Sequence, residues 1–330
     1  MDQQELLAEL KSNVTQIDQV MRDDLSIIDS PQLSKILNHA IFNGGKRVRP
    51  LLAILAADLC ASQKKQNRDQ LYKLAITLEY LHAASLLHDD VIDNATQRRG
   101  QPSANKVWGS TSVILAGDYL HTRAMTIAGT EGGPKCLAVI GRATAAMVEA
   151  EFLQMKTVDQ RNTSTDNYFA VLNGKTAALI KAACEIGVLF AGGNKNKLKK
   201  LSTYGANLGL AFQIIDDLLD YLGDPAQTGK AVGNDLSEGK LTLPLIHTLE
   251  QIDGPDHARL LKLLAGEAEL QTKHFEQVRA LIAHHQGFDY ARRQAEQLID
   301  SAVSQLDTFP DSRPKEIMTG LAQYVLERKK

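Results

Sequence analysis

The sequence predicts an all-α protein in which the long helices of one large domain, residues 1–330, surround a central cavity. Three observations lead to this prediction. Apolar residues recur at three- and four-residue spacing through residues 71–87, 111–127, 137–155 and 198–222, which is the period of an α-helix. Runs that alternate apolar and polar residues between turns are nearly absent, so we expect no sheet. The breaks between the periodic stretches are short, and none has the composition of a flexible linker.

The elements follow one another between clusters of Gly, Pro and Asn. Residues 1–30 begin with a charged, amphipathic stretch, and we expect an N-terminal helix there. Breaks between helices are expected at residues 43–45, 99–102, 129–134, 192–194 and 223–234.

Composition narrows the class of protein. The formal net charge of -2 gives no general attraction to nucleic acid or to anionic lipid. Cys60, Cys136 and Cys184 are too few and too scattered for a disulfide framework or a cysteine-based zinc site. The N-terminus lacks the basic start and apolar run of a signal peptide, and no apolar stretch approaches the roughly 18 residues of a membrane span. We therefore expect a cytoplasmic protein that neither binds nucleic acid nor spans a membrane.

The first candidate site is an aspartate cluster that directly follows an apolar helical stretch. Asp89 and Asp93 are four residues apart, so on a helix they share one face and repel each other by roughly a few tenths of a kcal/mol. Asp90 lies between them. Carboxylates without nitrogen or sulfur ligands suit Mg²⁺, which bridges carboxylates to phosphate oxygens.

The same pattern recurs at Asp216, Asp217 and Asp220, again after an apolar helical run. One such cluster alone is as often a solvated acidic helix end. Two copies, each behind an apolar helix, are hard to obtain by chance, so the pair predicts a magnesium site that binds an anionic ligand.

Cationic side chains that would hold this anion are present. A glycine turn at residues 44–45 leads into a basic stretch and Pro50, and a basic loop at a helix N-terminus is an anion site. His82 lies two helical turns before Asp89 on roughly the same face. The candidate anion-binding residues are Lys46, Arg49, His82, Arg98, Arg99, Lys175, Thr176, Lys230 and Lys240. Each of them alone is more often a solvated or structural side chain.

Taken in order, these motifs resemble those of the trans-polyprenyl diphosphate synthase family, most closely the bacterial octaprenyl diphosphate synthases. The resemblance rests on residues 44–50, 87–93, 98–100, 117–118, 174–176, 212–220 and 239–245. It implies the isoprenoid synthase fold, a homodimer with which the N-terminal helix is associated, and three Mg²⁺ ions per active site. Leu241 stands where a proline is common, and Asn234 and Asp235 stand where the family often has paired aspartates, which puts loop closure in doubt.

The resemblance also implies roles for the individual residues. The metal ligands would be Asp89, Asp93 and Asp216, with Asp90, Asp217 and Asp220 nearby. Isopentenyl diphosphate would be held by Lys46, Arg49, His82 and Arg99. The allylic diphosphate would be held by Arg98, Lys175, Thr176, Gln213, Lys230 and Lys240. The catalytic set would be Asp89, Asp90, Asp93, Asp216, Asp217, Lys175 and Lys240.

The helical residues just before Asp89 indicate the length of the product. Ala84 and Ser85 lie about one turn, roughly 5.4 Å, before Asp89, and both are small. By resemblance, bulky side chains here stop the product at short lengths, so we expect a long product of around eight isoprene units for quinone side chains. Tyr80, Leu81 and Met125 are candidates for the floor of the tail channel. The alternative explanation is that Ala84 and Ser85 are small only to permit close packing of helices.

Other readings stay open at this point. One alternative is a medium-chain geranylgeranyl synthase. A class I terpene cyclase also uses an aspartate-rich helix, but it normally lacks the second cluster. A non-catalytic subunit of a heteromeric synthase typically loses an aspartate cluster, and here both are intact. We expect the product to pass to a membrane, although the chain does not span one.

Overall fold

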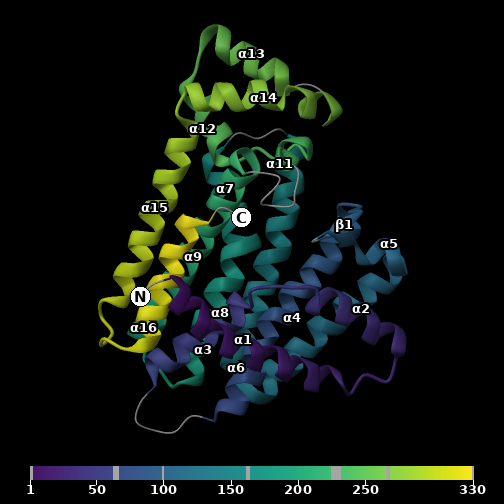
Figure 1. Ribbon diagram of the computed structural model, residues 1–330, viewed down its shortest axis with the longest axis vertical. Helices are drawn as coiled ribbons and strands as arrows, with labels where there is room; N and C mark the ends of the chain where they lie inside the picture. Colours follow the sequence, from purple (N-terminus) through teal and green to yellow (C-terminus); the bar gives the residue numbers. More distant parts are fainter. Residues whose placement is uncertain are drawn as a thin grey trace. The chain divides into compact units, whose positions relative to one another are not determined.

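Helices make up nearly all of the chain that the computed structural model describes, which confirms the predicted fold class (Figure 1). The described residues are 3–61, 67–98, 100–160, 164–223, 232–264 and 268–328. The helices are α1 (Gln3–Leu25), α2 (Pro31–Phe42), α3 (Val48–Cys60), α4 (Arg68–Ile92), α5 (Ala104–Trp108), α6 (Ser110–Asp159), α7 (Thr165–Leu172), α8 (Ala178–Phe190), α9 (Lys195–Leu222), α11 (Asn234–Ser237), α12 (Leu243–Gln251), α13 (Gly254–Leu264), α14 (Ala268–His284), α15 (Gly287–Leu306) and α16 (Arg313–Glu327). A π-helical turn, η1 (Asn173–Ala177), lies between α7 and α8.

The chain divides into two compact units, each built from separated stretches of sequence. Unit 1 holds residues 1–144, 179–205 and 305–320, and unit 2 holds residues 145–178, 206–304 and 321–330. Helices α6, α9 and α16 each supply residues to both units. The expectation of one domain around a central cavity stays a prediction.

Helix α4 is the central element of unit 1, where it packs against α1, α2, α3 and α5. Most residues from 71 to 87 are apolar, and α4 buries side chains on most of its circumference, Thr77 and Glu79 among them. The side chain of Asn67 accepts a hydrogen bond from the backbone N–H of Gln70, 3.2 Å away, and this cap starts the helix.

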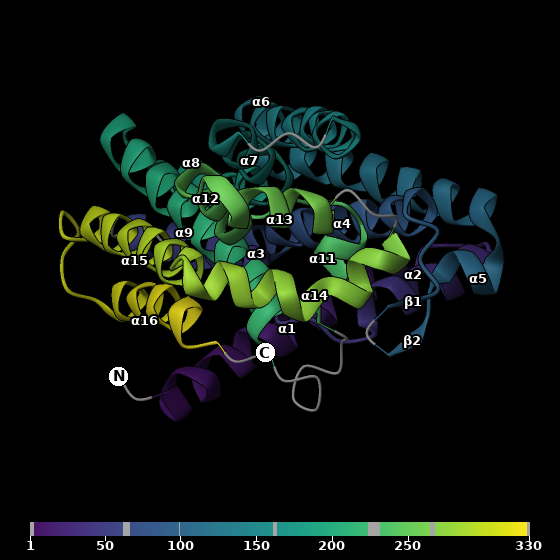
Figure 2. The same ribbon diagram turned by 90° about the horizontal axis from the view of Figure 1, so that it is seen from above.

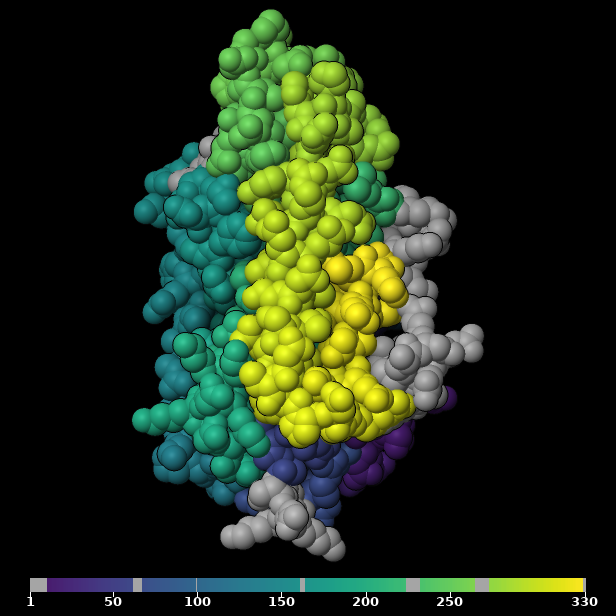
Figure 3. Space-filling view, turned by 90° about the vertical axis from the view of Figure 1, so that its left-hand side faces the viewer, coloured from purple at the N-terminus to yellow at the C-terminus, as the bar shows by residue number. Residues whose placement is uncertain are grey.

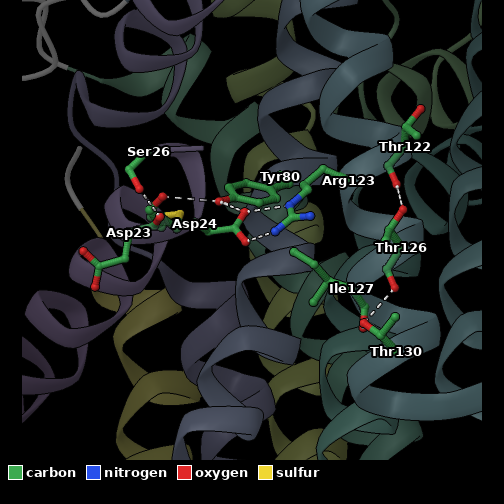
Figure 4. Close-up of polar contacts among 10 residues, drawn as sticks. Asp23, Asp24, Ser26, Tyr80, Thr122, Arg123, Thr126, Ile127 and Thr130 are labelled. Atoms are coloured by element: carbon green, nitrogen blue, oxygen red, sulfur yellow. Dashed lines mark hydrogen bonds and ion pairs between the residues drawn. The ribbon is translucent and has the colours of Figure 1, made fainter. Parts of the chain in front are cut away.

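A buried polar contact joins α1, α4 and α6 in unit 1 (Figure 4). The hydroxyl of Tyr80 donates to Asp24 Oδ2 over 2.9 Å, and Arg123 Nε donates to the same oxygen over 3.0 Å. Tyr80 is fully buried. Its ring is therefore a fixed part of the packing, and its role as the floor of a tail channel stays a prediction.

The expectation of no sheet is wrong at one place. Strands β1 (Gln97–Arg98) and β2 (Gln101–Pro102) form a two-stranded antiparallel hairpin, which Figure 2 shows beside α5. Each strand has only two residues, which is too short to leave an alternating pattern in the sequence.

The predicted break at residues 129–134 is a kink rather than an end. Gly133, with φ +72° and ψ -173°, is non-helical, yet α6 continues on both sides of it. Pro134 is the next residue, and its ring removes a helical hydrogen bond at the kink.

Unit 2 is organised around a second apolar core. Its cluster of buried residues is Tyr221, Leu236, Leu245, Leu249, Ile252, Leu260, Leu263, Leu264, Phe275, Val278, Leu281 and Ile282. Helix α14 packs against α11, α12 and α13, and the side chains of α14 and α15 form one face of this unit (Figure 3). Among the described residues, none of the helices combines the length and the apolar character needed to cross a bilayer.

Candidate active site

The first aspartate cluster lies where α4 ends. Asp89 is in the last turn of the helix and is half-buried, and Asp93 is the exposed residue that caps it. The backbone N–H of Asp93 donates to the carbonyl oxygen of Asp89 over 2.8 Å. The C-terminal end of a helix carries partial negative charge, so these carboxylates are placed where a cation is favoured.

Asp90 points the other way and is buried, with 2% of its surface exposed. Arg98 Nε donates to Asp90 Oδ1 over 2.7 Å, and Asn105 Nδ2 donates to the carbonyl oxygen of Asp90 over 2.8 Å. Arg98 stands on strand β1 and is about one third exposed. The Arg98 guanidinium therefore pairs with Asp90 from the hairpin, at the edge of a small recess that both residues line.

The three cations of the basic stretch at the start of α3 lie in different environments. Arg47 has a left-handed backbone, φ 50°, and turns into the protein, where Nη1 lies 2.8 Å from Glu79 Oε1 and Nε lies 2.7 Å from Asp18 Oδ1. Lys46 is exposed and Arg49 is half-buried. Helix α3 begins at Val48, so Pro50 lies in its first turn rather than at its first position.

His82, Ala84 and Ser85 lie on α4 before the aspartates. His82 is half-buried, and its carbonyl oxygen accepts a hydrogen bond from Ser85 Oγ over 3.0 Å. Ala84 is fully buried. Arg99, which was expected to join His82 at a diphosphate, lies outside the described residues, and so does Lys230.

The second aspartate cluster lies in the last two turns of α9, in unit 2. Asp216 is partly exposed, and Arg328 Nη2 lies 3.0 Å from its Oδ1. The Arg328 guanidinium also stacks over the ring of Phe212, 4.3 Å from its centroid. Asp220 accepts hydrogen bonds from the backbone N–H groups of Asn234 and Asp235 at the start of α11, over 3.2 and 3.0 Å.

Asp217 is the buried member of the second cluster, with 4% of its surface exposed. The hydroxyl of Tyr168 donates to its Oδ2 over 2.7 Å, and Gln213 Nε2 donates to its Oδ1 over 2.9 Å. Thr176 Oγ1 donates in turn to Gln213 Oε1 over 2.8 Å. Burial, and after it the charge of Asp235, raises the pKa of Asp217 well above its usual range. The network thus holds Asp217 in one orientation.

The π-helical turn η1 places Lys175 and Thr176 beside α9. One extra residue in this turn shifts the register between α7 and α8, and such bulges are frequent at functional sites. Gly174 makes the turn possible, because a Cβ there would lie 2.4 Å from the Cβ of Ala150 and 2.5 Å from the carbonyl oxygen of Ala146. Lys175 Nζ lies 2.7 Å from Glu151 Oε2.

These side chains line one pocket inside unit 2, with about 790 Å³ of space that includes its open mouth. Its polar wall brings together five of the predicted residues, namely Lys175, Thr176, Gln213, Asp217 and Lys240, with Tyr168, Asn167 and Asp235 beside them. Its apolar wall includes Val158, Val171, Leu172, Leu241 and Ile246. A pocket lined by Lys175 and Lys240 as well as by apolar side chains suits a ligand with an anionic head and a hydrocarbon tail.

Three residues of this site were not predicted from the sequence. Tyr168 lies seven residues, or two turns, before Lys175, and this spacing was an available signal. Glu151 and Arg328 stand in no motif, and only the folded chain brings them to Lys175 and Asp216.

Comparison with known proteins gives a consistent result. A family model described as polyprenyl synthetase matches residues 30–282. The chain is 34% identical to an octaprenyl diphosphate synthase of Haemophilus influenzae, over 91% of this chain and 89% of that one. A crystal structure of a decaprenyl diphosphate synthase from Rhodobacter capsulatus has a TM-score of 0.89 at 35% identity and covers 99% of both chains. A geranylgeranyl pyrophosphate synthetase from Pyrococcus horikoshii has a TM-score of 0.89 at 30% identity, over 98% of this chain and 99% of that one.

Proposed function

The chain belongs to the polyprenyl synthetase family of transferases, and we propose that it condenses isopentenyl diphosphate with an allylic diphosphate to form a long all-trans polyprenyl diphosphate. The observation that carries this proposal is the pocket of unit 2. Its lining combines Lys175, Lys240 and Thr176 with apolar side chains, which fits the diphosphate and the hydrocarbon part of an allylic diphosphate.

The acidic residues fit Mg²⁺ by their donor chemistry. Asp89, Asp93 and Asp216 offer only oxygen ligands, and each is at least partly exposed, so each can reach an ion. We expect these three residues to hold three ions together with the diphosphate. Asp90 and Asp217 are buried and hydrogen-bonded, so their role is to position the clusters. The chemistry that bound Mg²⁺ supplies is neutralisation of the charge on the departing diphosphate.

The remaining residues bind and orient the two substrates. Lys175, Thr176, Gln213 and Lys240, with Arg98 and Lys230, are proposed to hold the allylic diphosphate. Lys46, Arg49, His82 and Arg99 are proposed to hold isopentenyl diphosphate. Two separate sets of cations are what a reaction between two diphosphates requires.

In the proposed reaction the allylic C–O bond breaks, and its electron pair leaves with the diphosphate. The isopentenyl double bond attacks the resulting allylic cation and forms the new C–C bond. A proton then leaves the isopentenyl unit, and the released diphosphate is the base that takes it. The apolar wall of the pocket keeps water away from the cation.

The test is turnover with farnesyl diphosphate, isopentenyl diphosphate and Mg²⁺. Asp89→Ala and Asp216→Ala are each expected to lower turnover by at least about 100-fold, since loss of one charge-stabilising group typically has this effect. The control is Asp311→Ala, which removes a fully exposed carboxylate that pairs with Lys315, and it should keep normal turnover. Near-normal turnover of both active-site variants would contradict the proposed function.

We propose a long product, around eight isoprene units, because Ala84 is fully buried and small and Ser85 is the next residue of α4. Such a product would serve as the side chain of a quinone. The proposed enzyme is cytoplasmic, and its product would pass from it to a membrane. The second candidate is a medium-chain product, since geranylgeranyl synthases are also among the similar proteins.

Measuring the chain length of the extracted product distinguishes the two candidates. The Ala84→Phe variant tests whether the growing tail passes Ala84. A phenyl ring one turn before Asp89 should shorten the product if the tail runs along α4. Ala83→Phe, at the neighbouring buried position, controls for simple disruption of packing. An unchanged product from a folded Ala84→Phe variant would show that the tail runs elsewhere. Cyclised products formed without isopentenyl diphosphate would instead indicate a terpene cyclase, and a chain inactive on its own would indicate a non-catalytic subunit.

A further inference from the structure

Three potential metal-binding side chains meet in unit 2, where α13 begins and α14 ends. Asp256 is in the first turn of α13, His284 is the last residue of α14, and His285 follows it. Four of the nine histidines of the chain lie between residues 257 and 285. None of these residues belongs to the proposed reaction.

The ligand atoms of Asp256, His284 and His285 all lie within 4.8 Å of one another. His285 Nε2 is 3.1 Å from Asp256 Oδ2, and the rings of His284 and His285 are 4.7 Å apart at 81°. Zinc binds histidine nitrogen and carboxylate oxygen at about 2.0–2.2 Å, so two ligands of a tetrahedral ion are separated by roughly 3.3 Å. The observed separation of the first pair is close to this value.

The two helix ends are held in place by the apolar core. Leu260, one turn after Asp256, is fully buried, and Leu281 and Ile282, just before the histidines, are buried in the same cluster. Helix α13 packs against α14 along this core. The backbone N–H of His285 donates to the carbonyl oxygen of Leu281 over 3.1 Å, which fixes the turn that follows α14. The three side chains therefore project from anchored positions, as a metal site requires.

We propose that Asp256, His284 and His285 bind a divalent transition-metal ion of the zinc class, with water at the fourth position. Two imidazoles and one carboxylate are the donors that zinc and its neighbours prefer, whereas magnesium and calcium prefer oxygen alone. The bound ion would fasten the start of α13 to the end of α14. His284 is exposed and Asp256 and His285 are partly exposed, so an ion can enter from solvent.

A second group of this kind in the described part of the chain is less suited to a metal. His88, Asp118 and His121 also lie within 4.8 Å of one another, on α4 and α6 of unit 1. However, His88 Nε2 lies 3.1 Å from the carbonyl oxygen of Ile114 and would donate its hydrogen there. A metal on that nitrogen would have to displace this hydrogen bond.

The alternative for the first group is an ion pair between His285 and Asp256 without a metal, in which His284 has no part. The two explanations differ in what they predict for His284. Loss of its exposed imidazole should not alter an ion pair, whereas it should remove one ligand of a metal ion.

The experiment is a zinc titration of the full chain after treatment with a chelator, in excess Mg²⁺ and with a competing chromophoric chelator as the readout. The wild type should bind one Zn²⁺ tightly, and His284→Ala, His285→Ala and Asp256→Asn should each weaken it by at least about tenfold. Co²⁺ in place of Zn²⁺ should give the absorption of a site with nitrogen ligands, and the same three variants should lose it.

His257→Ala, beside Asp256, and His121→Ala, in the other group, are the matched controls and should keep the zinc affinity. Asp89→Ala should keep it too, so failure of the proposed reaction and failure of this site can be told apart. Circular dichroism checks that each variant is folded, and His284→Ala carries little risk because its side chain is exposed. Unchanged zinc affinity in folded His284→Ala and His285→Ala variants would overturn the proposal.

Discussion

Asp235 lies on the wall of the unit 2 pocket, close enough to other acidic groups for their charges to act on it. Burial is the largest influence and the charge of Asp220 is the next, and together they raise the pKa of Asp235 to about 7, although Lys240 lowers it. The ionised form is therefore disfavoured in the folded, metal-free protein. A cation bound by the neighbouring aspartates would reverse this preference.

The stability of the metal-free protein should therefore depend on pH through Asp235. The pKa of Asp235 is higher in the folded state than in the unfolded state, where it is near 4, so protonation of Asp235 stabilises the folded state. This stabilisation is complete below about pH 4 and is lost as the pH rises through about 7. Asp235→Asn removes the charge. We expect it to raise the free energy of unfolding at pH 8 by on the order of 1–2 kcal/mol, after a discount for partial exposure, and to change it little at pH 4.

Urea denaturation in the presence of a chelator at pH 4, 6 and 8 measures this difference. Asp253→Asn, an exposed aspartate in the same unit, is the control and should show no such trend. An Asp235→Asn variant that is equally destabilised at all three pH values would show that the carboxylate is needed for packing rather than disfavoured by burial.

At the scale of elements, the π-helical turn η1 determines where the polar wall of the pocket stands. A regular helix from α7 into α8 would turn Lys175 and Thr176 by about 100° for each residue of register, away from Gln213. The turn fits because Gly174 lets the backbone approach the part of α6 that holds Ala146 and Ala150. The conformation of one short turn thus places two proposed diphosphate ligands.

Gly174→Ala should therefore disturb both stability and turnover. Its Cβ would meet a backbone oxygen that cannot move away, so we expect destabilisation by about 1–3 kcal/mol and a large loss of turnover. Gly141→Ala on α6 is the matched control, because nothing lies within 4 Å of its added Cβ, and it should be neutral or slightly stabilising. Thermal unfolding and turnover of the two variants make the comparison. Equal behaviour would mean that η1 tolerates a side chain.

At the scale of the whole molecule, apolar side chains remain exposed along α6. Within unit 2, Val148, Phe152 and Met155 follow one another at helical spacing with 51%, 67% and 42% of their surface exposed. Such a row of exposed apolar side chains is typical of a protein interface. It is a candidate surface for the homodimer that the resemblance implies.

If the chain forms the expected homodimer through this row, Phe152→Glu should shift it toward the monomer, because a charge would have to be buried at the interface. Size-exclusion chromatography with light scattering across micromolar concentrations measures the mass. Gln297→Glu, which adds the same charge on an exposed position of α15, should leave the mass unchanged. If Phe152→Glu has the mass of the wild type, the interface lies elsewhere.

The sequence predicted the parts of the molecule that follow from period and local chemistry. The apolar period located α4, α6 and α9, and the spacing of the aspartates placed both clusters near the ends of their helices. It could not predict η1, because one inserted residue leaves the helical period almost unchanged. It also could not find Glu151 or Arg328, since neither stands in a motif and their partners Lys175 and Asp216 are distant in the chain. The inward turn of Arg47 between Lys46 and Arg49 depends on Glu79, which lies in another helix.

Each unit is built from separated stretches of the chain, and this limits when each can complete its folding during synthesis. Tyr204 donates its hydroxyl hydrogen to the carbonyl oxygen of Met318 over 2.7 Å within unit 1, and Arg328 pairs with Asp216 within unit 2. A ribosome that has released residues 1–300 has therefore completed neither unit, although most of both cores has been made. The nascent chain keeps apolar surface open until residues 305–328 emerge, and during that interval it is a substrate for chaperones and for aggregation. Slow translation before residue 305 would lengthen this interval without altering the finished protein.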